Sequence, residues 1–117
     1  MKITVSLKEN HLFRRLYQKG KTAADSRLAL YVRPNGREGN RLGLSVSTKL
    51  GHAVVRNRTR RRLREVYRLH EDELVRGRDV VIVARVRAAS STYQQLEKSF
   101  LYLARKLELL KKEREEA

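Results

Sequence analysis

The stretch from Ala53 to Glu73 constrains the fold most, because it holds seven arginines and neither glycine nor proline. Arginine, leucine and glutamate favour helix, so one long helix is predicted here. At about 100° per residue, one helical face carries the basic residues; these are Arg56, Asn57, Arg60, Arg61, Arg64 and Arg68. The opposite face is predicted to pack on a core; it carries Val55, Thr59, Leu63, Val66 and Leu69. Arg62 falls within that apolar face, and we expect its methylenes to be buried and its head to reach water.

The clustered positive charge indicates an anionic partner. The chain carries a formal net charge of +15 and a pI near 10.9. Glu65, four residues after Arg61, is the one carboxylate placed to neutralise this helix locally. Arginine suits bidentate contact with phosphate and stacking on bases, so a nucleic acid is the favoured partner, ahead of an anionic membrane surface. A solvated charged face without a ligand is the alternative.

Length and composition limit the remaining possibilities. We expect residues 1–117 to form a single RNA-binding domain, because the chain has one proline and no low-complexity tract. It has no cysteine, and its three histidines lack the spacing of a metal pair, so we expect no disulfide, metal ligands or catalytic residues. No apolar run reaches the roughly 20 residues of a membrane span, and no signal peptide is evident. The cytoplasm is therefore the expected location.

A short helix is predicted near the amino terminus. Ser6-Leu7-Lys8-Glu9 has capping-box spacing, and Gly20 is expected to end the helix. Four large side chains cluster on it, namely Leu12, Phe13, Leu16 and Tyr17. Considered alone, these residues indicate core packing.

Three strands can be predicted from hydrophobic patterning. Residues 27–33 and 41–48 alternate, and the Pro34-Asn35-Gly36 turn between them suggests a hairpin. Val80–Val86 is almost wholly apolar, which is typical of an interior strand. Because the long helix separates 41–48 from 79–86, these two strands are expected to pair in parallel. One face of 41–48 carries only Gly43, Ser45 and Ser47, so it is either the floor of a groove or an ordinary solvated face.

The last helix is predicted to begin at a cap on Ser91 or Ser90. Its apolar residues recur at spacings of four and three, which favours packing on the sheet; they are Leu96, Phe100, Leu103, Leu107 and Leu110. The tail, residues 111–117, is expected to fray.

A series of motifs matches a known family. Gly43-Leu44-Ser45-Val46-Ser47 and Lys49-Leu50-Gly51 precede the basic helix, which then carries Arg56-Asn57, Arg60-Arg61 and Arg64-Glu65. In this order and spacing the chain resembles the bacterial ribonuclease P protein subunit, and the resemblance covers nearly its whole length. It departs from the family pattern in two places: Arg60 stands where lysine is common, and Arg62 where the residue is often apolar.

The resemblance implies a fold and a function. The fold is a single-domain α/β sandwich of the α+β class, like domain 2 of ribosomal protein S5, with a mixed sheet of about four strands and three helices. The crossover through the basic helix is left-handed. The function is to assist a catalytic RNA, which uses Mg²⁺ to cut the 5′ leader from precursor tRNA. The protein itself supplies no catalytic residue and binds no cofactor.

The resemblance also implies two RNA-binding surfaces. A groove for the single-stranded leader is lined by Phe13, Tyr17, Tyr31, Ser45, Ser47 and Lys49. The basic helix contacts RNA, including the catalytic RNA, through Arg56, Asn57, Arg60, Arg61, Arg64 and Arg68. The expected partners are thus the catalytic RNA and precursor tRNA. Two alternatives remain, a structural RNA-binding protein of the ribosome and a self-sufficient nuclease using His11 and His52.

Overall fold

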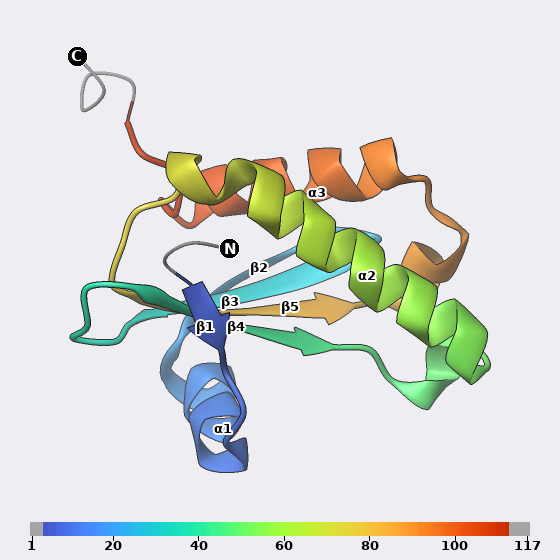
Figure 1. Cartoon of the computed structure of the whole chain (residues 1–117), viewed down its shortest axis with the longest axis horizontal. Coiled ribbons are helices and arrows are strands. Elements are labelled where there is room, and N and C mark those ends of the chain that lie inside the picture. Colours follow the sequence, from blue (N-terminus) through green and yellow to red (C-terminus); the bar gives the residue numbers. More distant parts are fainter. Residues whose placement is uncertain (1–3, 113–117) are drawn as a thin grey trace.

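The computed structural model describes residues 4–112, which form one five-stranded sheet with helices on both faces (Figure 1). The strands are β1 (Thr4–Ser6), β2 (Lys21–Ala24), β3 (Leu28–Pro34), β4 (Asn40–Ser45) and β5 (Arg78–Ala84). The α-helices are α1 (Asn10–Lys19), α2 (Ala53–His70) and α3 (Tyr93–Lys106). Three short 3₁₀ turns follow β4, α2 and β5, namely η1 (Thr48–Leu50), η2 (Glu71–Glu73) and η3 (Val86–Ser90).

The sheet is mixed, with the order β1-β4-β5-β3-β2. Strand β4 runs parallel to β1 and β5, whereas β3 is antiparallel to β5 and β2. The predicted parallel pair joined by the basic helix is therefore confirmed. In Figure 1, β4 lies nearer the viewer than β5 and α2 lies above both, so this crossover is left-handed, against the general preference.

The predicted hairpin between residues 27–33 and 41–48 is wrong. Strand β5 lies between β3 and β4, and β3 instead forms its hairpin with β2. The physical reason is that β5 is the most apolar strand, and the central position covers both its edges and both its faces. Strands β1 and β2 were not predicted, because three and four residues are too short to show an alternating pattern.

The main core lies between the sheet and the pair α2 and α3, which cover the same face (Figure 1). Helix α2 buries Leu63, Val66 and Tyr67, and α3 buries Leu96, Phe100 and Leu103. The prediction that Leu69 packs on the core is wrong, because this side chain is 52% exposed and Tyr67 takes the place instead. The Tyr67 ring packs edge-on against Phe100, with centroids 6.1 Å apart.

Among the helices of residues 4–112, α1 covers the other face of the sheet. Its Leu16 is buried against Val81 and Leu7, while Leu12 and Phe13 are partly buried beside them. The predicted capping box at Ser6 is wrong, because Ser6 ends β1 and Glu9 is the N-cap residue of α1. Pairing with Leu42 of β4 holds Ser6 in extended backbone. The predicted end at Gly20 is confirmed.

The boundaries of α3 differ from the prediction at both ends. Its N-cap is Thr92, not Ser91 or Ser90, because Thr92 and Gln95 together form a capping box. The helix ends at Lys106, so Leu107 and Leu110 pack on the core from the segment that follows. Of the tail expected to fray, residues 113–117 lie outside the described part of the chain.

Candidate nucleic-acid interface

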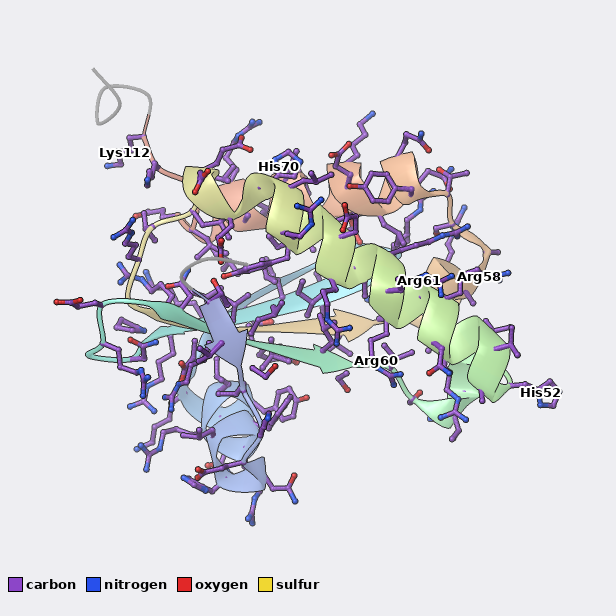
Figure 2. All side chains as sticks on the ribbon, in the orientation of Figure 1. His52, Arg58, Arg60, Arg61, His70 and Lys112 are labelled. Carbon is purple, nitrogen blue, oxygen red and sulfur yellow. The ribbon has the colours of Figure 1, made fainter. Side chains whose placement is uncertain are left out.

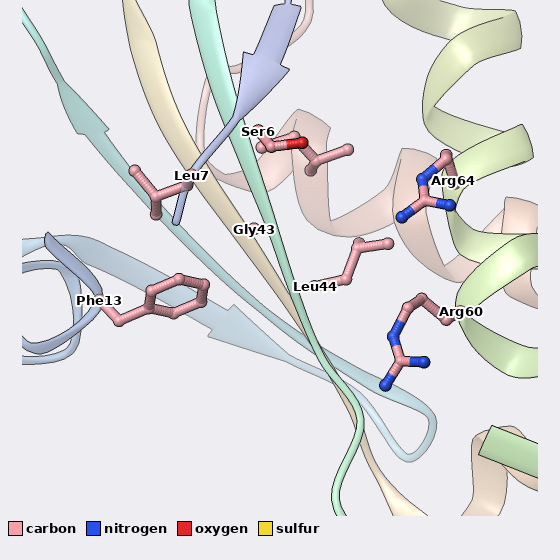
Figure 3. Close-up of a pocket in the computed structure, with 8 residues that line it drawn as sticks. Ser6, Leu7, Phe13, Gly43, Leu44, Arg60 and Arg64 are labelled. Atoms are coloured by element: carbon pink, nitrogen blue, oxygen red, sulfur yellow. The ribbon is translucent and has the colours of Figure 1, made fainter. Parts of the chain in front are cut away.

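A groove opens between α1, the β1–β4 edge of the sheet, and α2 (Figure 3). Its volume is about 180 Å³. We call it the central groove, and it is lined by Ser6, Leu7, Phe13, Leu42, Gly43, Leu44, Arg60 and Arg64. Apolar and aromatic atoms thus form one side and two guanidinium groups the other. The central groove thus lies between residues of the N-terminal helix and residues of the basic helix.

The absence of a side chain at Gly43 lets the Phe13 ring lie directly on β4. A Cβ atom built at Gly43 would stand 2.6 Å from Phe13 Cζ and 2.8 Å from Cε1. Real Cβ contacts are essentially never so short, so any other residue here would displace the ring. At Gly43 the small residue therefore serves a close approach by Phe13, so this part of the β4 face is covered by α1 and is not solvated.

Phe13 belongs to a cluster of three aromatic rings. The centroid of Tyr17 lies 6.4 Å from that of Phe13 and 4.9 Å from that of Tyr31. Tyr17 is 43% exposed, whereas Phe13 and Tyr31 also pack against the small core under α1. Phe13 thus both packs against this small core and lines the central groove.

The edge of β4 is open where it borders the groove. Strand β1 ends at Ser6, and beyond it the Leu7 N–H donates a 2.8 Å hydrogen bond to the Leu42 carbonyl. Successive residues of a strand direct their backbone groups to alternate edges, so Leu44 faces the same edge as Leu42. In residues 4–112 no strand pairs with Leu44 on that side. Its N–H and C=O therefore add a donor and an acceptor to the groove.

The basic face of α2 divides between the groove and the surrounding surface. Arg60 and Arg64 line the groove, and Arg60 also donates to the Asn57 side chain over 2.9 Å. Figure 2 shows Arg60 on the side of α2 that faces β4. The Arg56 Nε donates to the Gly51 carbonyl over 3.2 Å. Arg61 is exposed and makes no hydrogen bond or ion pair within the described residues.

Glu65 neutralises a different arginine from the one predicted. It binds Arg68, with Nε donating over 3.0 Å, and not Arg61. The hydrogen bond from Arg68 lowers the pKa of Glu65, and the same contact raises the pKa of Arg68. Within residues 4–112, Arg68 is therefore the basic-face residue that pairs with a carboxylate, whereas Arg60, Arg61 and Arg64 form no ion pair there.

Of the six residues predicted to line a leader groove, Phe13 lines the central groove, whereas the other five lie outside its lining; these are Tyr17, Tyr31, Ser45, Ser47 and Lys49. Ser45 is half-buried on the same face of β4 as Gly43, while Ser47 and Lys49 are exposed beyond the strand. The Ser47 hydroxyl accepts a 3.3 Å hydrogen bond from Lys49 N–H and so caps η1. Ser47 thus has a structural role that its sequence pattern did not show.

Several groove residues were missed in the sequence. Ser6 and Leu7 form one wall at the end of β1, a strand that was too short to predict, and the small size of Gly43 was noted without its contact with Phe13.

Arg58, outside the central groove, was not predicted as a site residue. It lines a second, open cleft with Arg62 and Tyr93, between α2 and the start of α3, where its Nε has no partner within residues 4–112. The Arg62 head donates to the Ser91 carbonyl over 3.1 Å, and so binds backbone where we expected only water.

The histidines lie on separate parts of the structure. His52 and His70 stand at opposite ends of α2 (Figure 2), and His11 on α1 pairs with Glu9 at 3.3 Å. Among residues 4–112 no three histidine, aspartate or glutamate side chains form a group that could hold a metal ion. Over the same residues, no helix is both long and apolar enough to cross a membrane.

Comparisons with known proteins decide the family. The Ribonuclease P family model matches residues 1–108. The Ribonuclease P protein component of Alkaliphilus metalliredigens is 42% identical over 104 residues, which cover 89% of this chain and 94% of the relative. That of Natranaerobius thermophilus is 41% identical over 108 residues, covering 92% and 94%. The chain belongs to the ribonuclease P protein family.

Solved structures of the family agree with this fold. The Staphylococcus aureus RNase P protein superposes with a TM-score of 0.84 at 32% identity, covering 91% of this chain and 97% of that one. A mutant of that protein, described as having defective mRNA degradation activity, gives a TM-score of 0.83 over 90% of this chain and 89% of that one. The chain is thus the protein component of a tRNA-processing endoribonuclease. These relatives support the ribonuclease P hypothesis and not the ribosomal one.

Proposed function

We propose that the protein binds the catalytic RNA of ribonuclease P through α2 and holds the 5′ leader of precursor tRNA in the central groove. The observation that carries the proposal is the Phe13 ring seated on Gly43 opposite Arg60 and Arg64. Aromatic faces beside cations suit an unpaired strand, because any base can stack on a ring while its phosphates meet the charges.

The open edge of β4 adds to the fit between groove and single strand. A double helix presents its bases inward, whereas an unpaired leader can direct base edges to the Leu44 backbone. Stacking is tolerant of sequence, so leaders of different sequence would all be held. The arginines outside the groove, Arg56 and Arg61 among them, then supply contacts to the catalytic RNA.

We assign the chemistry to the RNA. Mg²⁺ prefers oxygen ligands in octahedral geometry, and the described residues do not present a fitting group of carboxylates. Mg²⁺ would polarise and position the scissile phosphate when bound to the RNA. The protein's contribution is to bind and orient the leader. We place this work in the cytoplasm, where precursor tRNA of a bacterium is made.

Reconstitution with the catalytic RNA tests the proposal. Protein, RNA and the reconstituted complex are each assayed with a precursor tRNA, and with the same precursor shortened to a single leader nucleotide. Phe13→Ala should weaken binding of the long-leader substrate by about fivefold or more, because one base can no longer stack, and should change the shortened one little. Arg60→Ala with Arg64→Ala should weaken both.

Two outcomes would contradict the proposal. Equal losses for both substrates with Phe13→Ala would show that the groove does not hold the leader. Cleavage of precursor tRNA by purified protein alone, abolished by His52→Ala, would favour the self-sufficient nuclease. Because a relative is described by an mRNA degradation activity, the protein alone should also be tested on an mRNA.

A further inference from the structure

The outer face of α3 carries an exposed aromatic ring among cations, far from the central groove. Tyr102 is 52% exposed, and its ring receives the Lys106 ammonium group at 5.3 Å from the centroid. Lys98 lies one helical turn before Tyr102, as Lys106 lies one turn after it, so all three project from the same side of α3. No carboxylate within residues 4–112 forms an ion pair with either lysine.

A cleft lies directly beside this ring. It has a volume of about 370 Å³ between α3 and the turn that joins β2 to β3. It is lined by Asp25, Arg27, Gln95, Lys98, Ser99 and Tyr102. The volume is within the range of pockets that hold small organic ligands, and so accommodates a nucleobase.

The single acid in this cleft offsets one of the two positive charges in its lining, those of Arg27 and Lys98. Asp25 Oδ1 accepts hydrogen bonds from the backbone N–H groups of Arg27 (2.8 Å) and Leu28 (2.9 Å). Burial raises the pKa of Asp25, but its interaction with the Ser99 side chain and these backbone bonds more than offset this and lower the pKa, so Asp25 stays ionised and the lining keeps one net positive charge. Arg27 is fixed by a 3.0 Å hydrogen bond from its Nε to the Ser91 hydroxyl. That bond leaves the terminal nitrogens of Arg27 to act with Lys98 on an anion.

The surface is separate from the central groove. It lies beside β2 at one edge of the sheet, whereas the groove lies at β4, three strand spacings or about 14 Å across. Helix α3 also lies on the opposite face of the sheet from α1 and its aromatic cluster (Figure 1). A leader nucleotide that contacts Phe13 therefore cannot contact Tyr102 as well.

We propose that Tyr102, Lys98, Lys106 and Arg27 form a second single-stranded RNA site, at which an unpaired base stacks on Tyr102 while the flanking phosphates contact the cations. An exposed tyrosine ring with unneutralised lysines one turn to either side has the composition of a stacking platform. RNA is the occupant that uses both features of this surface, because its phosphates complement the cations and its bases can stack on the Tyr102 ring. An acidic protein would complement the lysines but would not need the exposed ring. The site goes beyond the proposed function and does not depend on leader binding.

Site-resolved NMR tests the proposal on the whole chain. Tetrauridylate is titrated into the protein while the ring resonances of Tyr102, Tyr17 and Tyr31 are followed, with Tyr102→Phe identifying the Tyr102 signal by its loss. Stacking should move the Tyr102 ring protons saturably upfield. Lys98→Glu with Lys106→Glu should weaken this response on the order of tenfold. Arg14→Glu with Arg15→Glu alters net charge equally at two exposed positions of α1, on the opposite face of the sheet from α3, and should weaken it far less.

The outcomes separate this site from the central groove. A Tyr102 response that saturates and is weakened selectively by the α3 variant supports the proposal, whatever Tyr17 and Tyr31 do. A silent Tyr102 at concentrations that saturate Tyr17 overturns it and leaves the surface to a protein partner. Equal weakening by both charge variants also overturns it, because long-range attraction would then explain the response. Failure of the proposed function would instead show in the reconstitution assay, as equal losses for the long-leader and shortened substrates with Phe13→Ala.

Discussion

Replacing Gly43 by alanine perturbs the central groove without removing any side chain that could contact RNA. The new Cβ would stand 2.6 Å from Phe13 Cζ, whereas ordinary contacts begin at 3.4 Å. The ring must therefore move by about the difference, 3.4 − 2.6, or 0.8 Å. Because Phe13 is only partly buried, it can move outward into the groove instead of forcing the backbone of β4 apart.

Two magnitudes follow from this displacement. Overpacking costs about 1–3 kcal/mol, and the partial exposure of Phe13 places the destabilisation near the lower value. Stacking of one base contributes about 1–3 kcal/mol, so displacing the ring should reduce leader-dependent affinity by about fivefold or more. Gly43→Ala should thus be well folded and yet impaired in leader recognition.

The assay is equilibrium binding of the reconstituted complex to precursor tRNA with a long leader and with a single leader nucleotide. The ratio of the two affinities isolates the leader contribution from binding of the tRNA body. Phe13→Leu serves as the matched variant, because a smaller side chain leaves room for the added Cβ. In that background Gly43→Ala should have little further effect, so the two substitutions should be strongly non-additive.

An unchanged affinity ratio in the folded Gly43→Ala variant would refute this reasoning. Additive effects of Gly43→Ala and Phe13→Leu would also contradict it, because they would show that Gly43 acts independently of the ring. Circular dichroism and a urea titration establish that each variant is folded before its binding is compared.

Three further predictions concern the basic helix and the core. Arg60→Ala with Arg64→Ala should make RNA binding less salt-dependent. In titrations at several salt concentrations, the slope of log affinity against log salt concentration should become shallower by about 0.7 for each single-strand phosphate that is no longer neutralised. An unchanged slope would exclude these residues from phosphate contact. His70 binds Glu73 and, at 2.8 Å, Glu97 of α3. Burial alone would lower the pKa of His70, but hydrogen bonds to Glu97 and Glu73 more than offset this and raise its pKa. The resulting stabilisation is present below the unfolded-state pKa of about 6.5 and is lost as pH rises through the folded-state value, so the melting temperature should fall over that interval and His70→Ala should remove the trend. Tyr67→Phe should cost about 1–2 kcal/mol in urea unfolding, because its buried hydroxyl bonds Thr4 at 2.9 Å and Asn40 at 3.3 Å; an unaltered urea midpoint would show that these bonds add nothing net.

The parts of the fold that were predictable from sequence are those with long, strongly patterned segments. The helix from Ala53 is indicated by its composition, and the strand after Asp79 by the length of its apolar run. The order of strands was not predictable from local signals, because Pro34-Asn35-Gly36 is typical of a hairpin turn whichever strand comes to lie beside β3. The insertion of β5 there is decided by burial of the whole sheet, which no short segment encodes.

The site was predictable only in part, for a similar reason. Phe13, Tyr17, Arg60 and Arg64 could be placed by resemblance and by helical periodicity. The fit of Phe13 on Gly43 depends on a contact between residues thirty positions apart, which periodicity does not report. Whether Glu65 pairs with Arg61 or Arg68 depends on side-chain rotamers, since both spacings are favourable on a helix.

Photocrosslinking from the leader tests the central claim most directly. Precursor tRNA carrying one 4-thiouridine in its leader is irradiated in the reconstituted complex, and the attached peptide is identified by mass spectrometry. The groove predicts adducts on the α1 peptide that contains Phe13 and Tyr17, reduced by Gly43→Ala while the complex stays assembled. Leader adducts confined to surfaces away from α1, β4 and the Arg60 side of α2 would contradict the account.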